Sequence, residues 1–247
     1  MKSIQDNVHF VLVRNLTKLL ISVADEKIRE VMEGWDYKMR VDAPAAAIFA
    51  VWYKFFKEYT FSDEFEKEEL GDLWKKIYES TLEYLATHRP NSDWFDDKNT
   101  SERENATIIA RKALNAAIEY LKQVFGTDDV RKWRLGGIHK LHAEHVLGRM
   151  FKGLNYPEVE VPGWTQCVNN IAEHGNSGPS WRMILNFANL SESLSVIPGG
   201  QSGNPFSEHY ADQLNIWIDG NYKTMDLPSS PEGVKNVAYR LIFEPAT

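Results

Sequence analysis

The sequence has a single cysteine, no long apolar run and a deficit of positive charge, and each shortage excludes a class of protein. Cys167 is the only cysteine among 247 residues, so no disulfide can form within the chain, and the compartment is left open. No apolar run approaches the roughly 18 residues that a membrane-spanning helix needs, so we expect no membrane span. The net charge of -7 is unfavourable for nucleic acid, because such binding depends on neutralising phosphates with Lys and Arg. The opening residues MKSIQDNVHF lack the basic lead and the apolar core of a signal peptide.

The first half of the chain has the three- and four-residue periodicity of amphipathic helices. It predicts four helices, which run over residues 4–23, 42–60, 68–85 and 102–124. Asp42 is the expected N-cap of the second helix. The sequence SERE at 101–104 predicts a capping box at the start of the fourth helix, and Gly126 is its expected stop.

After about residue 155 the apolar residues alternate instead, which is typical of strands. The sequence SWRMILNF at 180–187 predicts a strand with Arg182 and Asn186 on one face and, on the other, Trp181, Met183, Leu185 and Phe187. NVAYRLIF at 236–243 repeats the pattern, whereas TQCVNNI at 165–171 and SLSVI at 193–197 are weaker strand candidates. The predicted fold class is therefore α+β, with a mainly helical segment 1–155 followed by a mainly antiparallel β segment 156–247.

The sequence GGQSGNPFSEHYADQ at 199–213 looks at first like a catalytic loop. A nucleophile elbow needs the spacing Gly-x-Ser-x-Gly, but Gly203 follows Ser202 directly. A triad of Ser202, His209 and Asp212 is also disfavoured, because such groups normally converge from distant segments. We expect a tight glycine turn that leads into a short helix over about 210–217.

Three histidines in HKLHAEH raise the alternative of a metal site, since His139, His142 and His145 follow one another at three-residue steps. The zinc-protease patterns H-E-x-x-H and H-x-x-E-H are both absent. Three such steps drift around a helix, so we expect one histidine to be packed and the others to face water. No residue is assigned as a metal ligand.

Paired carboxylates can act as acid and base, and Asp36 and Asp42 are candidates for such a pair. Asp42 already has the capping role, and Asp36 lies in an expected turn. The sequence DEFEKEE at 63–69 is interpreted as a solvated acidic face. The residues by themselves therefore give no complete catalytic set.

Several strings together resemble the penicillin acylase family of N-terminal-nucleophile hydrolases, in the same order and over nearly the whole chain. They are SIQDNV, GWDYKMRVDAPAAAIFAVW, KWRLGGIHKLHAEHVLG, SGPSWRMILNF and, most specific, PGGQSGNPFSEHYADQLNIWIDGNY. The sequence departs from the family at Arg134 and Leu135, where Trp-Gly is common, and at Glu208, where proline is usual. The resemblance implies the carboxyl-terminal portion of an αββα acylase fold.

Members of this family hydrolyse amide bonds of acylated compounds such as penicillins, cephalosporins, acyl-homoserine lactones or lipopeptides. The resemblance implies a precursor that is cleaved into two chains, in which a freed N-terminal serine attacks and its α-amino group is the base. A terminal amine suits that role, because its pKa of about 7.7–8.0 is close to neutral pH.

The matched strings lie in the carboxyl-terminal part of the family's larger chain, beyond the nucleophile, the oxyanion asparagine and the calcium ligands. The resemblance therefore implies no catalytic residue and no cofactor in this chain, with calcium held by upstream residues if the complete enzyme binds it. The expected partners are the upstream part of the acylase and a small-molecule acyl amide. The motif residues are given a structural or cleft-wall role, and they are His139, Arg182, Gly200, Gln201, Ser202, Gly203, His209, Tyr210, Asp212 and Gln213.

Two other functions stay open at this point. One is a stand-alone, non-catalytic module that binds a ligand or a partner. The other is a metal hydrolase that uses His142 and His145.

Overall fold

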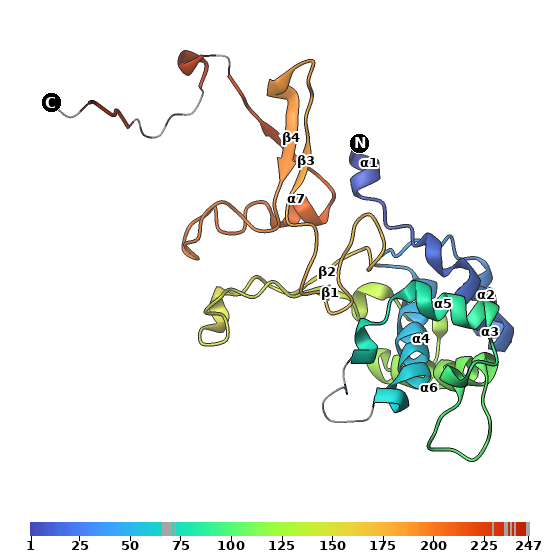
Figure 1. Ribbon diagram of the computed structural model, residues 1–247. Coiled ribbons are helices and arrows are strands. Elements are labelled where there is room, and N and C mark those ends of the chain that lie inside the picture. The colour runs from blue at the N-terminus through green and yellow to red at the C-terminus, as the bar shows by residue number, and fades with distance from the viewer. Residues whose placement is uncertain are drawn as a thin grey trace. The chain divides into compact units, whose positions relative to one another are not determined.

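The computed structural model describes residues 1–65, 71, 73–228, 230–234, 237, 239 and 241–245 (Figure 1). The chain forms two compact units, of which the larger is Ile4–Gly178 and the smaller combines Met1–Ser3 with Pro179–Thr247. Helices come first and small antiparallel sheets follow, so the predicted α+β class is confirmed. The boundary at residues 178 and 179 lies later than the change of periodicity near residue 155.

The larger unit is mainly helical. After the short α1 (Lys2–Gln5), its helices are α2 (Arg14–Val23), α3 (Glu26–Glu33), α4 (Pro44–Phe61), α5 (Glu79–His88) and α6 (Ala106–Phe125). The strands β1 (Lys140–Leu141) and β2 (Val159–Glu160) form an antiparallel pair in the same unit. No helix among the described residues is long and apolar enough to cross a bilayer.

Helix α4 is the centre of this unit and lies against α6 (Figure 1). Pro44 occupies the first turn, where its missing N–H costs little. Trp52 is fully buried, donates its indole N–H to the carbonyl oxygen of Ala110 at 3.0 Å, and stacks on Phe56. The small side chains of α6, such as Ala110 and Ala113, let the two helices approach closely.

Two predicted helix starts were wrong. The first long helix begins at Arg14 rather than near residue 4, because residues 8–10 pair with 37–39 in extended conformation. That pairing uses backbone groups which a helix would need. The N-cap of α4 is Ala43 and not Asp42, whose side chain is 87% exposed beside Arg40.

Two other segments also differ from expectation. Helix α3 was not predicted, and its N-cap Asp25 accepts a hydrogen bond from the Ile28 amide at 2.9 Å. The predicted helix over 68–85 is confirmed only in part, since α5 begins at Glu79, and residues 66–70 and 72 lie outside the described residues. The proposed acidic face at 63–69 likewise falls largely outside them.

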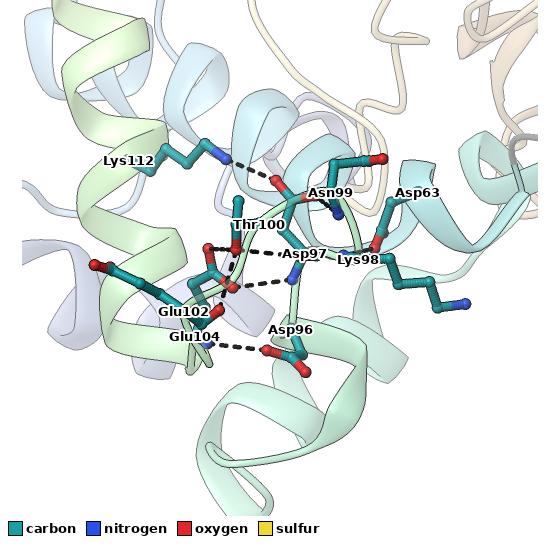
Figure 2. A network of polar contacts seen from close by, with 9 residues as sticks. All are labelled: Asp63, Asp96, Asp97, Lys98, Asn99, Thr100, Glu102, Glu104 and Lys112. Carbon is teal, nitrogen blue, oxygen red and sulfur yellow. Dashed lines mark hydrogen bonds and ion pairs between the residues drawn. The ribbon is translucent and has the colours of Figure 1, made fainter.

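The N-terminus of α6 is capped by Asn105, and the capping box predicted for Ser101 and Glu104 is wrong. The Asn105 side chain accepts hydrogen bonds from the amides of Thr107 at 3.0 Å and Ile108 at 3.1 Å. Glu104 instead turns into the preceding loop and accepts from the Asp97 amide and the Thr100 hydroxyl (Figure 2). The predicted stop at Gly126 is confirmed, because this residue has the left-handed conformation with φ 62°.

The capping assignment gives a direct test. The substitution Asn105→Ala is expected to lower the free energy of unfolding by about 1 kcal/mol, because two amides of the first turn lose their acceptor. Ser101→Ala is the matched control and should change it by less than about 0.5 kcal/mol. Urea unfolding followed by circular dichroism measures both. A larger loss for Ser101→Ala than for Asn105→Ala would contradict the assignment.

The smaller unit contains a three-stranded antiparallel sheet and one short helix. The strands β3 (Arg182–Ile184), β4 (Ser193–Val196) and β5 (Lys223–Met225) pair in the order β3-β4-β5. The predicted strand at 193–197 is thereby confirmed. The helix α7 (Leu214–Ile218) begins later than the predicted residue 210.

The buried face of β3 is the one that carries Arg182. Arg182 is only 4% exposed, whereas Trp181 and Phe187, which were predicted on the other face, are 56% and 86% exposed. Arg182 is buried because its side chain packs on Trp217 of α7, so this face of the strand meets the chain's own residues. None of the described residues of this unit buries the rings of Trp181 and Phe187.

Two further strand predictions have different outcomes. Residues 165–169 form turns and bends and residues 170–171 are irregular, so the strand predicted there was wrong. Of the strand predicted at 236–243, residues 236, 238 and 240 lie outside the described residues, and the others are not in a strand.

Candidate functional site

The loop at 199–213 folds tightly on itself. The Ser202 amide donates to the carbonyl oxygen of His209 at 3.1 Å, and the Gln213 amide donates to that of Gly199 at 2.8 Å. Gly200 is needed there because a Cβ atom would overlap the His209 carbonyl oxygen and lie 2.7 Å from the carbonyl carbon of Tyr210. The loop is therefore a compact turn, and the expectation of a glycine turn is confirmed.

The loop brings together two of the three candidate triad residues. His209 Nδ1 and Asp212 Oδ2 lie 3.1 Å apart, and Lys223 Nζ is 3.9 Å from the same carboxylate oxygen. These side chains share a shallow hollow of about 370 Å³ with Gln201, Ser202 and Ser207. The Ser202 Oγ accepts a hydrogen bond from the Asn204 amide at 3.1 Å, which engages the hydroxyl in its own turn.

The side chains of this hollow can contact a polar group, but they do not activate Ser202 as a nucleophile. Among the described residues, no hydrogen bond joins Ser202 to the His209 ring, which is the contact that general-base activation needs. The His209 side chain is 61% exposed, so water surrounds it. The hollow can hold a polar group, but it provides no proton relay from the serine.

Gln213 and Arg182 are buried polar residues of the smaller unit. The Gln213 side chain is buried, and its Oε1 accepts a hydrogen bond from the Ile197 amide at 3.4 Å. The Arg182 guanidinium lies over the Trp217 ring and donates to its carbonyl oxygen at 2.7 Å. The Trp217 indole donates in turn to the carbonyl oxygen of Pro179 at 3.0 Å. These contacts join the start of β3 to α7.

The remaining motif residues of the loop make fewer contacts. Gly203 has open space around the position that a Cβ atom would take. Gln201 is exposed, and Tyr210 is half-buried with its amide bonded to the carbonyl oxygen of Ser207 at 3.1 Å.

The three histidines of HKLHAEH do not form a cluster. The segment contains β1 and irregular chain rather than a helix. His139 packs on Trp164 with 4.8 Å between ring centroids, whereas His142 Nδ1 lies 3.1 Å from Glu158 and His145 Nδ1 accepts from the Leu147 amide. Within the part of the chain that the structure describes, no group of three or more His, Cys, Asp or Glu side chains is arranged to hold a metal ion.

His139 is the buried histidine of the three. It is 1% exposed, and neither ring nitrogen makes a hydrogen bond of good geometry with a described residue. Burial lowers the pKa of His139 to about 4, against a weaker opposing effect of the Glu173 backbone. The ring is therefore neutral at pH 7. Burial likewise raises the pKa of the Cys167 thiol to about 12, so this cysteine is an unreactive core residue.

The helical unit also contains two adjoining cavities along α4, of about 260 and 530 Å³, which the sequence analysis did not predict. Both are lined by Lys54, Glu173 and His174. The sign of them in the sequence is the pair of cations, Lys54 and Lys57, within a mainly apolar helix.

A sequence profile of the penicillin amidase family matches residues 1–232. The chain belongs to the penicillin amidase family. The resemblance inferred from the motifs is thereby confirmed.

Relatives within the penicillin amidase family have informative names. The acyl-homoserine lactone acylase QuiP of Pseudomonas aeruginosa is 26% identical over 247 residues, covering 86% of this chain and 28% of the relative. The QuiP acylase of Pseudomonas fluorescens strain Pf-5 is 25% identical over 211 residues, covering 81% of this chain and 25% of the relative. The chain thus spans about a quarter of the length of these relatives.

A solved structure of a penicillin amidase supports the fold. The thermostable penicillin G acylase of Alcaligenes faecalis matches 98% of this chain and 48% of its own, with a TM-score of 0.50 and 16% identity. At that identity the likeness concerns the fold alone.

Proposed function

We propose that this chain is the carboxyl-terminal portion of an amidohydrolase that cleaves the amide bond of N-acylated substrates. The observation that carries the proposal is the family match over residues 1–232 in a chain whose serine loop lacks an activated nucleophile. The attacking group is then an N-terminal serine on the upstream part of the enzyme, with its own α-amino group as base. Our proposal gives this chain the role of support and cleft wall.

The substrate class follows from the relatives by analogy. The named relatives act on acyl-homoserine lactones, so we take these amides as the first class to test, ahead of penicillins, cephalosporins and lipopeptides. In this scheme the hollow of Ser202, His209 and Asp212 lies in the cleft wall and contacts polar substrate atoms. Calcium, if the complete enzyme binds it, is held by upstream residues.

The exposed apolar side chains that flank β3 are consistent with a missing partner. Trp181 and Phe187 present large apolar surface, which monomeric proteins rarely gather without a function. Upstream residues of the acylase would cover it. A stand-alone, non-catalytic module has no upstream residues to cover these two rings. Their exposure therefore favours the acylase over such a module.

Hydrolysis of N-decanoyl-homoserine lactone tests the proposal. The chain should be inactive alone and active when co-expressed with the upstream part, and replacing the upstream N-terminal serine by alanine should abolish that activity. Release of homoserine lactone, measured by mass spectrometry, is the readout. Hydrolysis by the isolated chain that is lost in the Ser202→Ala variant would contradict the proposal, because it would place the nucleophile here.

A further inference from the structure

The two cavities beside α4 form one continuous groove within the unit 4–178. The smaller lies between α4 and the segments around Lys140 and Trp164, and the larger extends along α4 towards Trp74. Since Lys54, Glu173 and His174 line both, the cavities meet at these side chains. We call this space the α4 groove, and its polar lining consists of Tyr53, Lys54, Lys57, Glu58, Ser62, Lys75, Lys140, His142, Glu173 and His174.

A buried hydroxyl faces this space without a partner. Tyr53 lines the larger cavity, is 2% exposed, and its phenol oxygen has no hydrogen-bond partner among the described residues. Buried polar groups are almost always hydrogen-bonded, so an orphaned hydroxyl at a cavity wall calls for an explanation. Burial raises the pKa of Tyr53 well above its usual range, so the phenol keeps its proton and can donate it to an acceptor in the groove.

The groove is cationic in a chain of net charge -7. Four lysines line it, against two glutamates. Lys57 is mostly buried and donates to the carbonyl oxygen of Lys75 at 2.9 Å. Burial lowers the pKa of Lys57, against the weaker opposing effects of the Glu79 and Glu173 carboxylates. The two glutamates offset two of the four lysines, so the lining keeps an excess of positive charge, and Lys54 and Lys140 are placed to attract an anion. The Glu173 carboxylate, which lies where the two cavities meet, also disfavours the binding of a doubly charged anion.

The smaller cavity has an aromatic and apolar wall. Its rings are those of Phe55, Tyr120 and Trp164, and Ala50, Val51 and Ile138 complete the lining. A flat ring can stack against such side chains, which contributes beyond the burial of apolar area.

The loop that carries Glu173 and His174 is held in place by Gly175. This glycine has φ 66°, and a Cβ atom there would overlap the Lys140 carbonyl oxygen. The His142 amide donates to the Gly175 carbonyl oxygen at 2.8 Å, so the loop lies directly against β1. The groove is therefore formed before any ligand arrives, as small-molecule sites usually are.

We propose that the α4 groove binds a small aromatic monocarboxylate. Its ring lies in the smaller cavity against Phe55 and Trp164, and its carboxylate lies at the junction beside Lys54. The Tyr53 hydroxyl donates a hydrogen bond to the ligand from the larger cavity. This site contains no part of the loop at 199–213 and is independent of the hydrolysis proposed above.

Isothermal titration calorimetry on the full chain with 2-naphthoate tests the site, and neutral 2-naphthamide is the matched control ligand. We expect saturable binding of naphthoate and at least about tenfold weaker binding of naphthamide, since a charge-assisted contact is lost. Lys54→Met should weaken naphthoate at least about tenfold, and Tyr53→Phe several-fold. Lys18→Met, which removes an exposed charge on α2, should leave the Kd within about twofold.

Lys54 is exposed, so its variant should keep the thermal midpoint of the wild type and remain interpretable. Absence of saturable naphthoate binding would overturn the proposal. Equal affinity of naphthoate and naphthamide, or of the wild type and Lys54→Met, would overturn it as well.

Discussion

Lowering the pH from 7 to 4 is expected to remove about 3 kcal/mol from the free energy of unfolding through His139 alone. The folded-state pKa of this residue is about 4, against an ordinary value of 6.5. A difference of one pKa unit corresponds to about 1.4 kcal/mol between the two protonation states. The loss of unfolding free energy is not reduced by solvent screening, because the His139 ring is only 1% exposed.

The direction follows from proton binding. Between pH 6.5 and pH 4 the unfolded chain takes up a proton on His139 that the folded chain does not, so stability falls as the pH falls. Above pH 6.5 both states hold the neutral ring, and the effect vanishes.

The measurement is urea unfolding at a series of pH values for the wild type and for His139→Leu, an apolar side chain of similar volume. Carboxylates also titrate in this range, but they do so in both proteins, and the difference between the two curves isolates His139. The variant should lose about 3 kcal/mol less than the wild type on acidification. Parallel curves would contradict the assignment of a neutral, buried ring.

Replacing Gly200 by alanine is expected to lower the free energy of unfolding of the smaller unit by about 1–3 kcal/mol. The added methyl would overlap the His209 carbonyl oxygen and lie 2.8 Å from Asp212 Oδ1. Both neighbours belong to the same turn, and the overlapping atom is backbone, which cannot rotate away. The turn must therefore open, and the contact between His209 and Asp212 should loosen with it.

Gly203→Ala is the matched control, because a Cβ atom there meets nothing within 4 Å. Thermal unfolding followed by tryptophan fluorescence measures both variants, and Trp217, which is buried in this unit, contributes to the signal. A shift of the midpoint for Gly203→Ala as large as that for Gly200→Ala would contradict the packing described for the loop.

Local sequence signals predicted α6 and its end well, because Gly126 acts through its own backbone conformation. The start was predicted less well. Ser101 and Glu104 have capping-box spacing, but Glu104 finds better partners in the loop at 96–100, and Asn105 takes the capping role. A capping pattern predicts that a helix starts nearby, and tertiary contacts decide which residue is the cap.

The orientation of β3 could not be predicted from its alternation. The pattern assumes that apolar residues face the core, but the core that this chain supplies to the strand is Trp217, which pairs with Arg182. For the candidate site, the turn at 199–213 was predictable because its contacts are local. The α4 groove was not, since it joins residues 53–57 of a helix to Lys140 and to residues 173–174, far apart in sequence.

Within the residues that the structure describes, β3 pairs with β4 on one side only and is an edge strand of the sheet. Such an edge is a template for any extended peptide, whether from the rest of an acylase or from a second misfolded copy. A preparation of this chain by itself is thus expected to aggregate by edge-to-edge strand addition. Lysine or proline at outward positions of β3 would be the first substitutions to try for keeping it in solution.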